Sequence, residues 1–473
     1  MKLSRSTTVA LIVAIAFFMQ NLDTTAVNTA IPAMAKSFGT DVVHLSAGVT
    51  SYLIALAIFI PVSGWIADRY GARRVFCTAI VLFIISSMLC GMSQSLPQFV
   101  VFRIFQGMAG AMMTPVGRLA VLKATPKEEL VTAIAYITWP GLIAPILGPL
   151  VGGYLTTYWS WHWIFYLNIP LSLICIPLAW HFIPQEKENS ELPPKRFDMV
   201  GFILSGLALA GFMYGVELLS RTEIAYYVPV AVIIASLLIL GFNIRYSRHI
   251  SNPLIDYSVV NIPTYRVTIF TGSLSRMVIG VAPFLVPLMF QVGWGLSPFE
   301  SGLLFLATMA GNLTMKPITL WVMRRFNFKS VLITNGFMVV VFTLLTAFLL
   351  PSTPLVLIVT VMFLSGMFRS MQFSAITTLA FTDIPQPRMT AANTLYSTVQ
   401  QMSTGMGIAM GAVFLRFSHL INNGESHEPY SIPDFRLAFI LVAILGLMSL
   451  YGYTKLTPDA GDVVRVKKRN RDS

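Results

Sequence analysis

The sequence carries little charge. Only 11% of its 473 residues are Asp, Glu, Lys or Arg, whereas hydrophobic residues make up 55% and the mean hydropathy is +0.72. Soluble domains have about a quarter charged residues, so this composition excludes an ordinary soluble protein and predicts an integral membrane protein. The net charge of +12 is therefore not a nucleic-acid signal in itself, and no nucleic-acid partner is expected.

Cysteine is scarce, and the common catalytic motifs are absent. Cys77, Cys90 and Cys175 lie in apolar runs without a CxxC or Cys/His cluster, which predicts neither a disulfide framework nor a metal site. The sequence has no GxxxxGK[ST] phosphate loop and no GxSxG elbow. These absences argue against an enzyme, against an ATP-driven pump in one chain and against an organic cofactor.

Long apolar runs dominate what is present. Runs of about 20 residues, each long enough to cross the hydrocarbon core of a bilayer, number about fourteen. The sequence thus predicts an all-α integral membrane protein. The expected spans are residues 9–34, 46–67, 75–94, 97–123, 130–156, 163–183, 199–218, 226–245, 266–291, 299–322, 331–350, 354–380, 390–416 and 434–453.

The basic residues are distributed unevenly between alternate loops. If the N-terminus is cytoplasmic, most Lys and Arg fall in the cytoplasmic loops and tails, as the positive-inside rule requires. Both termini are therefore expected in the cytoplasm, with the first apolar run retained as a helix. The opposite side then has only Lys36, Arg221, Arg416 and Arg436.

An internal repeat divides the chain into two halves. "PVSGWIADRYGARRV" (61–75) and "PITLWVMRRFNFKSV" (317–331) match at an offset of 256 residues. Parallel half-repeats of transporters enclose the substrate site near mid-membrane. The expected parts are a six-helix bundle (1–183), a cytoplasmic linker (184–198), two extra helices (199–250), a second six-helix bundle (251–455) and a basic tail (456–473).

Four stretches of the first half resemble the major facilitator superfamily, specifically its fourteen-helix drug:proton antiporters of the EmrB/QacA type. They are "LDTTAVNTAIP" (22–32), "GWIADRYGARR" (64–74), "RIFQGMAGAMMTPVGR" (103–118) and "GLIAPILGPLVGGYL" (141–155). "WHWIFYLNIP" (161–170) also recurs in that branch. The resemblance implies the major facilitator fold, here two six-helix bundles plus two extra helices.

Asp23 is the most informative single residue. No other charge occurs between Arg5 and Lys36, and a carboxylate at membrane depth is costly unless protein or water surrounds it. Arg103 falls at a similar depth in the fourth span, so the two side chains can meet. The resemblance supports the hypothesis that Asp23 binds the transported proton and that Arg103 sets its affinity. A static ion pair that holds two helices together is the alternative.

The loop between the second and third spans has the motif that the resemblance associates with a conformational latch. Its glycines permit a tight turn, and its basic residues can anchor the loop at an anionic leaflet. Charge that serves only to orient the chain is the alternative. The candidate latch residues are Gly64, Asp68, Arg69, Gly71, Arg73, Arg74 and Arg118.

The fifth span combines proline with glycine, which predicts a bent helix with a flat face for close packing. In the resembling family this motif is associated with antiport, although ordinary small-residue packing explains the same pattern. The candidate residues are Pro145, Gly148, Pro149, Gly152 and Gly153.

Substrate contacts are expected from both halves. Arg276 and Arg369 fall near mid-depth without an accompanying acid, and Lys316 lies nearer the cytoplasmic end, where its long side chain could snorkel. Such a site favours neutral or anionic amphiphiles over dicationic drugs. The candidate cavity residues are Met19, Gln20, Asn28, Arg276 and Arg369.

The expected function is proton-coupled export of small amphiphilic compounds across the bacterial inner membrane, with the proton as the coupling ion. A dedicated exporter of one metabolite or fatty-acid-like anion is one alternative. A membrane receptor or regulator that reuses the fold is another. The expected partners are the small-molecule substrate and the lipid bilayer, and a periplasmic adaptor is left open.

Overall fold

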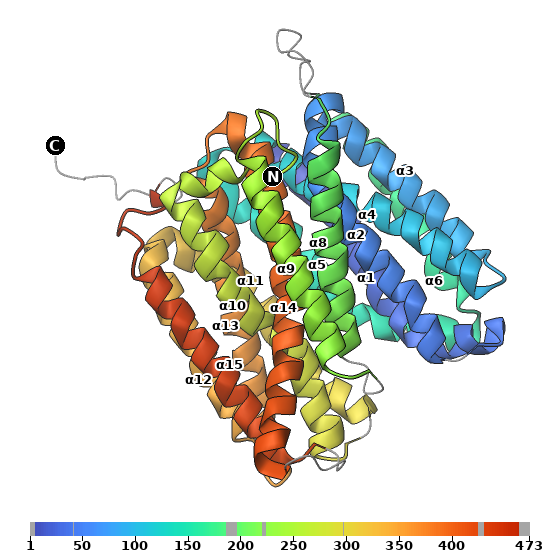
Figure 1. The fold of residues 1–473 in the computed structure, drawn as a ribbon, viewed down its shortest axis with the longest axis vertical. Helices are drawn as coiled ribbons and strands as arrows, with labels where there is room; N and C mark the ends of the chain where they lie inside the picture. Colours follow the sequence, from blue (N-terminus) through green and yellow to red (C-terminus); the bar gives the residue numbers. More distant parts are fainter. Residues whose placement is uncertain are drawn as a thin grey trace. The chain divides into compact units, whose positions relative to one another are not determined.

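The computed structural model describes residues 5–40, 42–185, 196–219, 224–296, 298–423 and 430–462, and within some helices the backbone alone. Every regular element in these ranges is a helix (Figure 1). Each of the fourteen expected spans falls on a described helix, which confirms the predicted all-α architecture.

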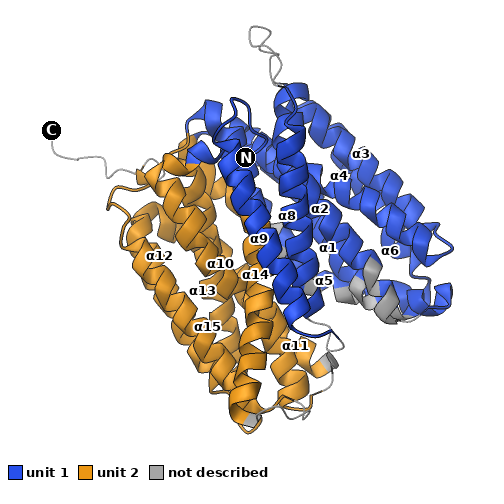
Figure 2. Cartoon of the chain, viewed as in Figure 1, with its two compact units in different colours: residues 1–126, 136–259, 385–398 blue, residues 127–135, 260–384, 399–473 orange. Residues whose placement is uncertain are grey.

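The chain divides into two compact units (Figure 2). Unit 1 comprises residues 1–126, 136–259 and 385–398, and unit 2 comprises residues 127–135, 260–384 and 399–473. The two extra helices belong to unit 1. The boundaries expected from the sequence stay predictions.

Unit 1 is built around α4, which packs against α1, α2 and α3. The α8–α9 hairpin attaches to this bundle through α8 and α2, where the rings of Phe59 and Phe202 lie 5.7 Å apart. The helices of unit 1 are α1 (Arg5–Phe38), α2 (Val42–Tyr70), α3 (Ala72–Gly91), α4 (Leu96–Ala124), most of α5 (Leu130–Tyr158), α6 (His162–Tyr166), α7 (Asn168–Phe182), α8 (Met199–Leu219) and α9 (Tyr227–Ser247).

Unit 2 has α13 near its centre, in contact with α10, α11 and α12. A core that includes the fully buried Leu285, Phe290 and Phe435 joins α10 to α15. Its helices are α10 (Pro263–Leu288), continued by a π-helical turn (Met289–Gly293), α11 (Pro298–Arg325), α12 (Phe328–Ala347), α13 (Leu355–Thr382), the larger part of α14 (Met389–Asn423) and α15 (Ile432–Tyr453).

Proline accounts for two irregular spans. The sixth expected span is broken at Leu167 into α6 and α7, close to Pro170, which cannot donate a backbone hydrogen bond. In α10, Pro283 and Pro287 precede the π-helical turn at Met289–Gly293. Lost backbone bonds of this kind loosen a helix locally and permit such a turn.

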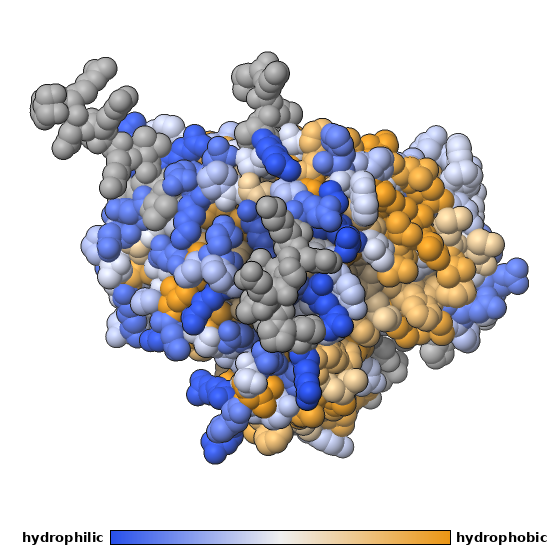
Figure 3. All heavy atoms as spheres, turned by 90° about the horizontal axis from the view of Figure 1, so that it is seen from above, coloured by the Kyte–Doolittle hydropathy of each residue, from blue (hydrophilic) through white to orange (hydrophobic). Residues whose placement is uncertain are grey.

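The surface supports membrane insertion. Among the described residues, thirteen helical segments are long and apolar enough to cross a membrane, and the remaining expected span falls on α5. Large apolar side chains such as Ile234, Leu238 and Phe242 of α9 are exposed, as lipid contact requires. The face seen from above the view of Figure 1 carries both hydrophilic and hydrophobic residues (Figure 3).

The packing repeats at the offset that the sequence predicts. In unit 1, a Cβ on Gly107 of α4 would lie 2.5 Å from the backbone oxygen of Tyr52 and 2.9 Å from Cβ of Ala55, both on α2. At the offset of 256 residues, Ala55 corresponds to Gly311 and Gly107 corresponds to Phe363. In unit 2, a Cβ on Gly311 of α11 would collide with the carbonyl oxygen of Phe363 on α13. The same helix crossing is thus built twice.

We predict that Gly311→Ala destabilises the protein, because the added methyl group meets backbone that cannot move aside. Overpacking of this kind costs about 1–3 kcal/mol. Gly302 on the same helix has open space at its Cβ position, so Gly302→Ala is the matched control and should be neutral or slightly stabilising. Thermal unfolding of the purified variants measures the effect of each substitution on stability. Equal melting temperatures of the two variants would contradict the close contact of α11 with α13 at Gly311.

Candidate functional site

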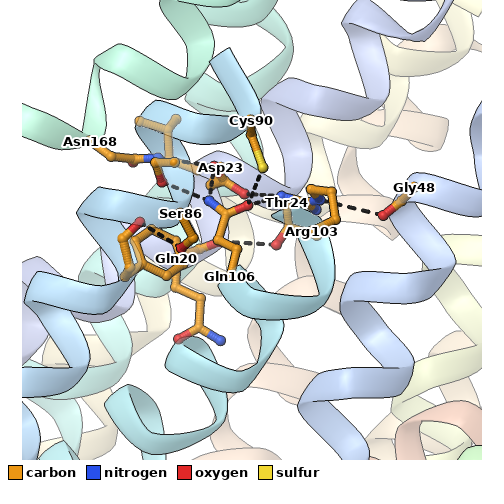
Figure 4. Close-up of polar contacts among 12 residues, drawn as sticks. Gln20, Asp23, Thr24, Gly48, Ser86, Cys90, Arg103, Gln106 and Asn168 are labelled. Atoms are coloured by element: carbon orange, nitrogen blue, oxygen red, sulfur yellow. Dashed lines mark hydrogen bonds and ion pairs between the residues drawn. The ribbon is translucent and has the colours of Figure 1, made fainter. Parts of the chain in front are cut away.

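Asp23 of α1 and Arg103 of α4 form a buried ion pair (Figure 4). Nη1 of Arg103 donates to Oδ2 of Asp23 at 2.7 Å, and both side chains have 0% exposure. The structure therefore brings together the two residues that the sequence selected. Asp23 faces protein and not lipid.

The second carboxylate oxygen of Asp23 is held by two amides. Nε2 of Gln106 donates to Oδ1 at 3.0 Å, and Nδ2 of Asn168 donates to the same atom at 2.9 Å. Each of these nitrogens also lies within hydrogen-bond distance of Oγ of Ser87, at 2.7 and 3.2 Å. Every one of these groups is at least 98% buried. The carboxylate thus accepts one charged and two neutral hydrogen bonds.

Arg103 is enclosed on all sides. Its guanidinium lies over the ring of Tyr52 at 4.2 Å, Nε donates to the backbone oxygen of Gly48 at 3.4 Å, and Nη1 also donates to Oε1 of Gln106 at 2.6 Å. Among the described residues, Nη2 of Arg103 has no hydrogen-bond partner. One donor of a buried cation is therefore available for a further acceptor.

The site draws on five helices of unit 1. Asp23 comes from α1, Tyr52 from α2, Ser87 from α3, Arg103 and Gln106 from α4, and Asn168 from α7. Gln106, Ser87, Asn168 and Tyr52 are not among the residues predicted from the sequence. Two signals were present: Gln106 follows Arg103 by three residues and so shares its helix face, and Asn168 lies within the quoted 161–170 stretch.

The candidate cavity residues of α1 lie near this site. Met19 is fully buried and accepts a hydrogen bond from Oγ of Ser172, and Gln20 accepts one from Thr114 on α4. The side chain of Asn28 lies outside the described residues. Met19 and Gln20 therefore connect α1 to α7 and α4 one turn from Asp23.

Local structure explains two glycines of the 64–74 motif, Gly64 within α2 and Gly71 between α2 and α3. Gly71 adopts a φ of 81°, a left-handed conformation that glycine tolerates best, and it caps the start of α3. Gly64 lies against Thr394 in the first turns of α14, which belong to unit 1; a Cβ at Gly64 would lie 3.3 Å from Cβ of Thr394. Close approach at Gly64 and a tight turn at Gly71 are thus both present.

The charged residues of this motif lie at the end of α2 and the start of α3 and have separate partners. Asp68 pairs with Lys123 of α4 at 4.0 Å, Arg69 lies over the ring of Trp65, and Arg73 lies over Trp180 while donating to Gln185. Arg74 is exposed. The partners of Arg73 join α3 to the end of α7.

Arg118 reaches the first turns of α14. Its Nη1 donates to Oγ of Ser397 at 3.4 Å, and its guanidinium lies over the ring of Tyr396 at 5.2 Å. One turn away, Nδ2 of the buried Asn393 donates to the backbone oxygen of Pro115 at 2.9 Å. These contacts join α4 to the start of α14 within unit 1.

The antiporter-motif residues lie on α5. A Cβ on Gly148 would collide with Thr25 of α1, so this glycine permits close packing of the two helices. Gly152 is buried, whereas a Cβ on Gly153 would meet open space. Pro145 and Pro149 lie within α5, and their side chains are outside the described residues. The role of this motif in antiport stays a prediction.

The three mid-helix cations that the sequence singled out in unit 2 are buried. Arg276 is 2% exposed, Arg369 is 5% exposed and Lys316 is 4% exposed. The expectation that Lys316 could snorkel is wrong, because its Nζ donates to Oγ of Ser374 on α13 at 2.7 Å. The side chain points across the helix pair and not along the helix toward the membrane surface.

Comparisons with known proteins identify the family. A family model described as Major Facilitator Superfamily matches residues 13–408, with a second match over 268–470. The chain belongs to the major facilitator superfamily, and it is a multi-pass membrane protein.

Its curated relatives are bacterial proteins named "Putative multidrug resistance protein MdtD". That of Serratia proteamaculans is 37% identical over 86% of this chain and 85% of its own length. That of Pectobacterium atrosepticum is 34% identical over 95% of both chains.

Solved structures agree in fold. The human organic anion transporter MFSD10 matches with a TM-score of 0.67 at 12% identity, over 95% of this chain and 100% of its own. The proton:xylose symporter XylE matches with a TM-score of 0.66 at 14% identity, over 97% of both chains. At such identities the likeness shows the fold alone.

We predict that Arg103→Gln destabilises the protein by about 3–5 kcal/mol, because it leaves the buried Asp23 without a counter-ion. The double variant Asp23→Asn/Arg103→Gln should be more stable than Arg103→Gln, since the uncompensated charge is gone. Thermal unfolding of the two single variants and the double variant gives the coupling energy. Additive effects of the two substitutions would show that the pair contributes no coupling.

Proposed function

We propose that the protein is a proton-coupled antiporter that exports small amphiphilic compounds by alternating access. The observation that carries this proposal is the Asp23 carboxylate, buried at membrane depth and held by Arg103, Gln106 and Asn168. An ionisable group inside a membrane protein is costly and usually functional. The names of the relatives support a small-molecule substrate.

Protonation of Asp23 would change the contacts of three helices at once. The carboxylate accepts from groups on α4 and α7. A protonated Asp23 loses its charge attraction to Arg103, and its new O–H faces three N–H donors, none of which can accept it. Arg103 is then left to find another acceptor. Binding of a proton therefore favours a different arrangement of α1, α4 and α7, which is how a ligand shifts a conformational equilibrium.

In this proposal, the protein faces each side of the membrane in turn. It takes up a proton from the outer side, releases it inside, and carries the substrate in the opposite direction. The protein lies in the inner membrane of a bacterium with both termini in the cytoplasm. The basic loop at Arg73 and Arg74 supports this orientation by the positive-inside rule. The dedicated exporter of one anionic metabolite is the second candidate, favoured by the buried cations of unit 2.

Asp23→Asn should abolish proton-linked efflux in everted membrane vesicles, because an amide cannot take up the proton. The exposed Asp459 lies outside the spans, so Asp459→Asn is the matched control and should transport normally. Export of anionic, neutral and cationic compounds and the accompanying pH change are measured together. Undiminished efflux by Asp23→Asn would refute the assignment, and substrate binding by the wild type without any proton movement would favour a receptor.

The latch hypothesis adds that the contact between α2 and the start of α14, which lies within unit 1, opens during the transport cycle. A Cβ placed on Gly64 would lie 3.3 Å from that of Thr394, slightly below the roughly 3.5–4.5 Å between the Cβ atoms of disulfides, so a small shift brings two cysteines to bonding distance. Gly64→Cys/Thr394→Cys should therefore crosslink on oxidation, stop transport and recover with a reductant. The native cysteines are buried and should not compete. Full transport by the oxidised, crosslinked protein would show that this contact stays closed throughout the cycle.

A further inference from the structure

Helices α11 and α13 of unit 2 run parallel in a constant register. A Cβ on Gly366 would collide with the backbone oxygen of Thr308. One turn further, Oγ of Ser370 donates to the backbone oxygen of Asn312 at 2.8 Å, and another turn on Lys316 meets Ser374. This close crossing places Lys316 and Arg369 on one rigid pair of helices.

Both cations have unused donors. In the part of the chain that the structure describes, Nε of Arg369 has no hydrogen-bond partner, although the residue is 5% exposed and lies near the middle of α13. The Lys316 ammonium carries three donors, and its contact with Ser374 uses one of them. Arg369 precedes Ser374 by five residues, about 7.5 Å along the helix axis.

Unit 2 offers these cations little negative charge. Within its described residues, the one fully buried acid is Asp434, and its carboxylate is held by His419, Asn422 and Ser431. A buried charge is costly unless it is paired and hydrogen-bonded. Lys316 and Arg369 are therefore in an environment that an anion would stabilise.

The scaffold itself does not require these cations. The offset of 256 residues that relates the two helix crossings carries Lys316 to Ile60 and Arg369 to Met113. Unit 1 thus builds the equivalent pair, α2 and α4, with apolar side chains at both positions. A residue whose charge is not needed for packing and is costly to bury is best explained by a ligand.

We propose that the exported compound carries a carboxylate, which binds Arg369 and Lys316 on the α11–α13 pair. The inference rests on the proposed export function and names its substrate class as organic monoanions with an apolar body. The guanidinium of Arg369 can hold a carboxylate with two parallel hydrogen bonds, and Lys316 adds a second positive charge.

Equilibrium binding to the full-length protein in phosphatidylcholine nanodiscs tests this proposal without any proton gradient. The probes are three carboxylates, benzoate, 1-naphthaleneacetate and decanoate, each compared with its alcohol and its ammonium analogue. At least one carboxylate should bind about tenfold more tightly than its alcohol, as a charged hydrogen bond provides. If no carboxylate binds more tightly than its alcohol, the proposal is wrong.

Variants then assign the binding to these residues. Arg369→Gln and Lys316→Gln should each weaken carboxylate binding about tenfold and leave alcohol binding unchanged. Arg369→Lys should retain part of the affinity, since it keeps the charge. Arg325 lies at the exposed end of α11, so Arg325→Gln removes one charge as the matched control. Equal loss for the control, or equal loss of alcohol and carboxylate, would overturn the assignment.

The two proposals can fail separately. Carboxylate binding that persists while the vesicle assay shows no proton exchange would remove antiport and keep the anion site. Proton-linked export restricted to neutral or cationic compounds, without carboxylate binding, would remove the anion site and keep antiport. Size-exclusion chromatography and a thermal unfolding curve for each variant establish that it is folded.

Discussion

The buried ion pair between Asp23 and Arg103 is the interaction on which the functional argument depends. Removing two charges from water costs more than their mutual attraction returns unless further hydrogen bonds complete the geometry. Here Gln106 and Asn168 complete it, and both also reach Ser87 on α3. The positions of α1, α3, α4 and α7 are therefore linked to the charge of one carboxylate. A proton that neutralises it acts on the packing of the whole group.

The sequence predicted the spans well because apolar length is a direct physical requirement of a bilayer. It also selected Asp23 and Arg103, since charges inside apolar runs are rare and costly. It did not select Gln106, Ser87 or Asn168, because uncharged polar residues are common in membrane helices and most of them only join helices. Lys316 shows a second limit: the sequence placed it at the right depth, but depth does not give the direction in which a long side chain points.

The two units share a scaffold but not their charges. The glycine-mediated crossing of α2 with α4 recurs as the crossing of α11 with α13 at the offset of 256 residues. At the same offset Asp23 corresponds to Ile279 and Arg103 to Val359, whereas Lys316 and Arg369 of unit 2 correspond to the apolar Ile60 and Met113. The helix crossing that repeats serves packing, whereas the charged residues that do not repeat lie at the two candidate sites. In the proposed mechanism, proton binding thus falls to unit 1 and binding of the substrate anion to unit 2.

The charge of the substrate decides how strongly the membrane potential drives export. One inward proton moves one positive charge, worth about 2.3 kcal/mol per 100 mV. An exported monoanion moves a further negative charge outward, so the same cycle gains about 4.6 kcal/mol per 100 mV. An exported monocation would cancel the proton's charge and gain nothing from the potential. If Asp23 of unit 1 carries one proton per cycle, as proposed, the buried Lys316 and Arg369 of unit 2 suit an exporter that draws on the potential twice in each cycle.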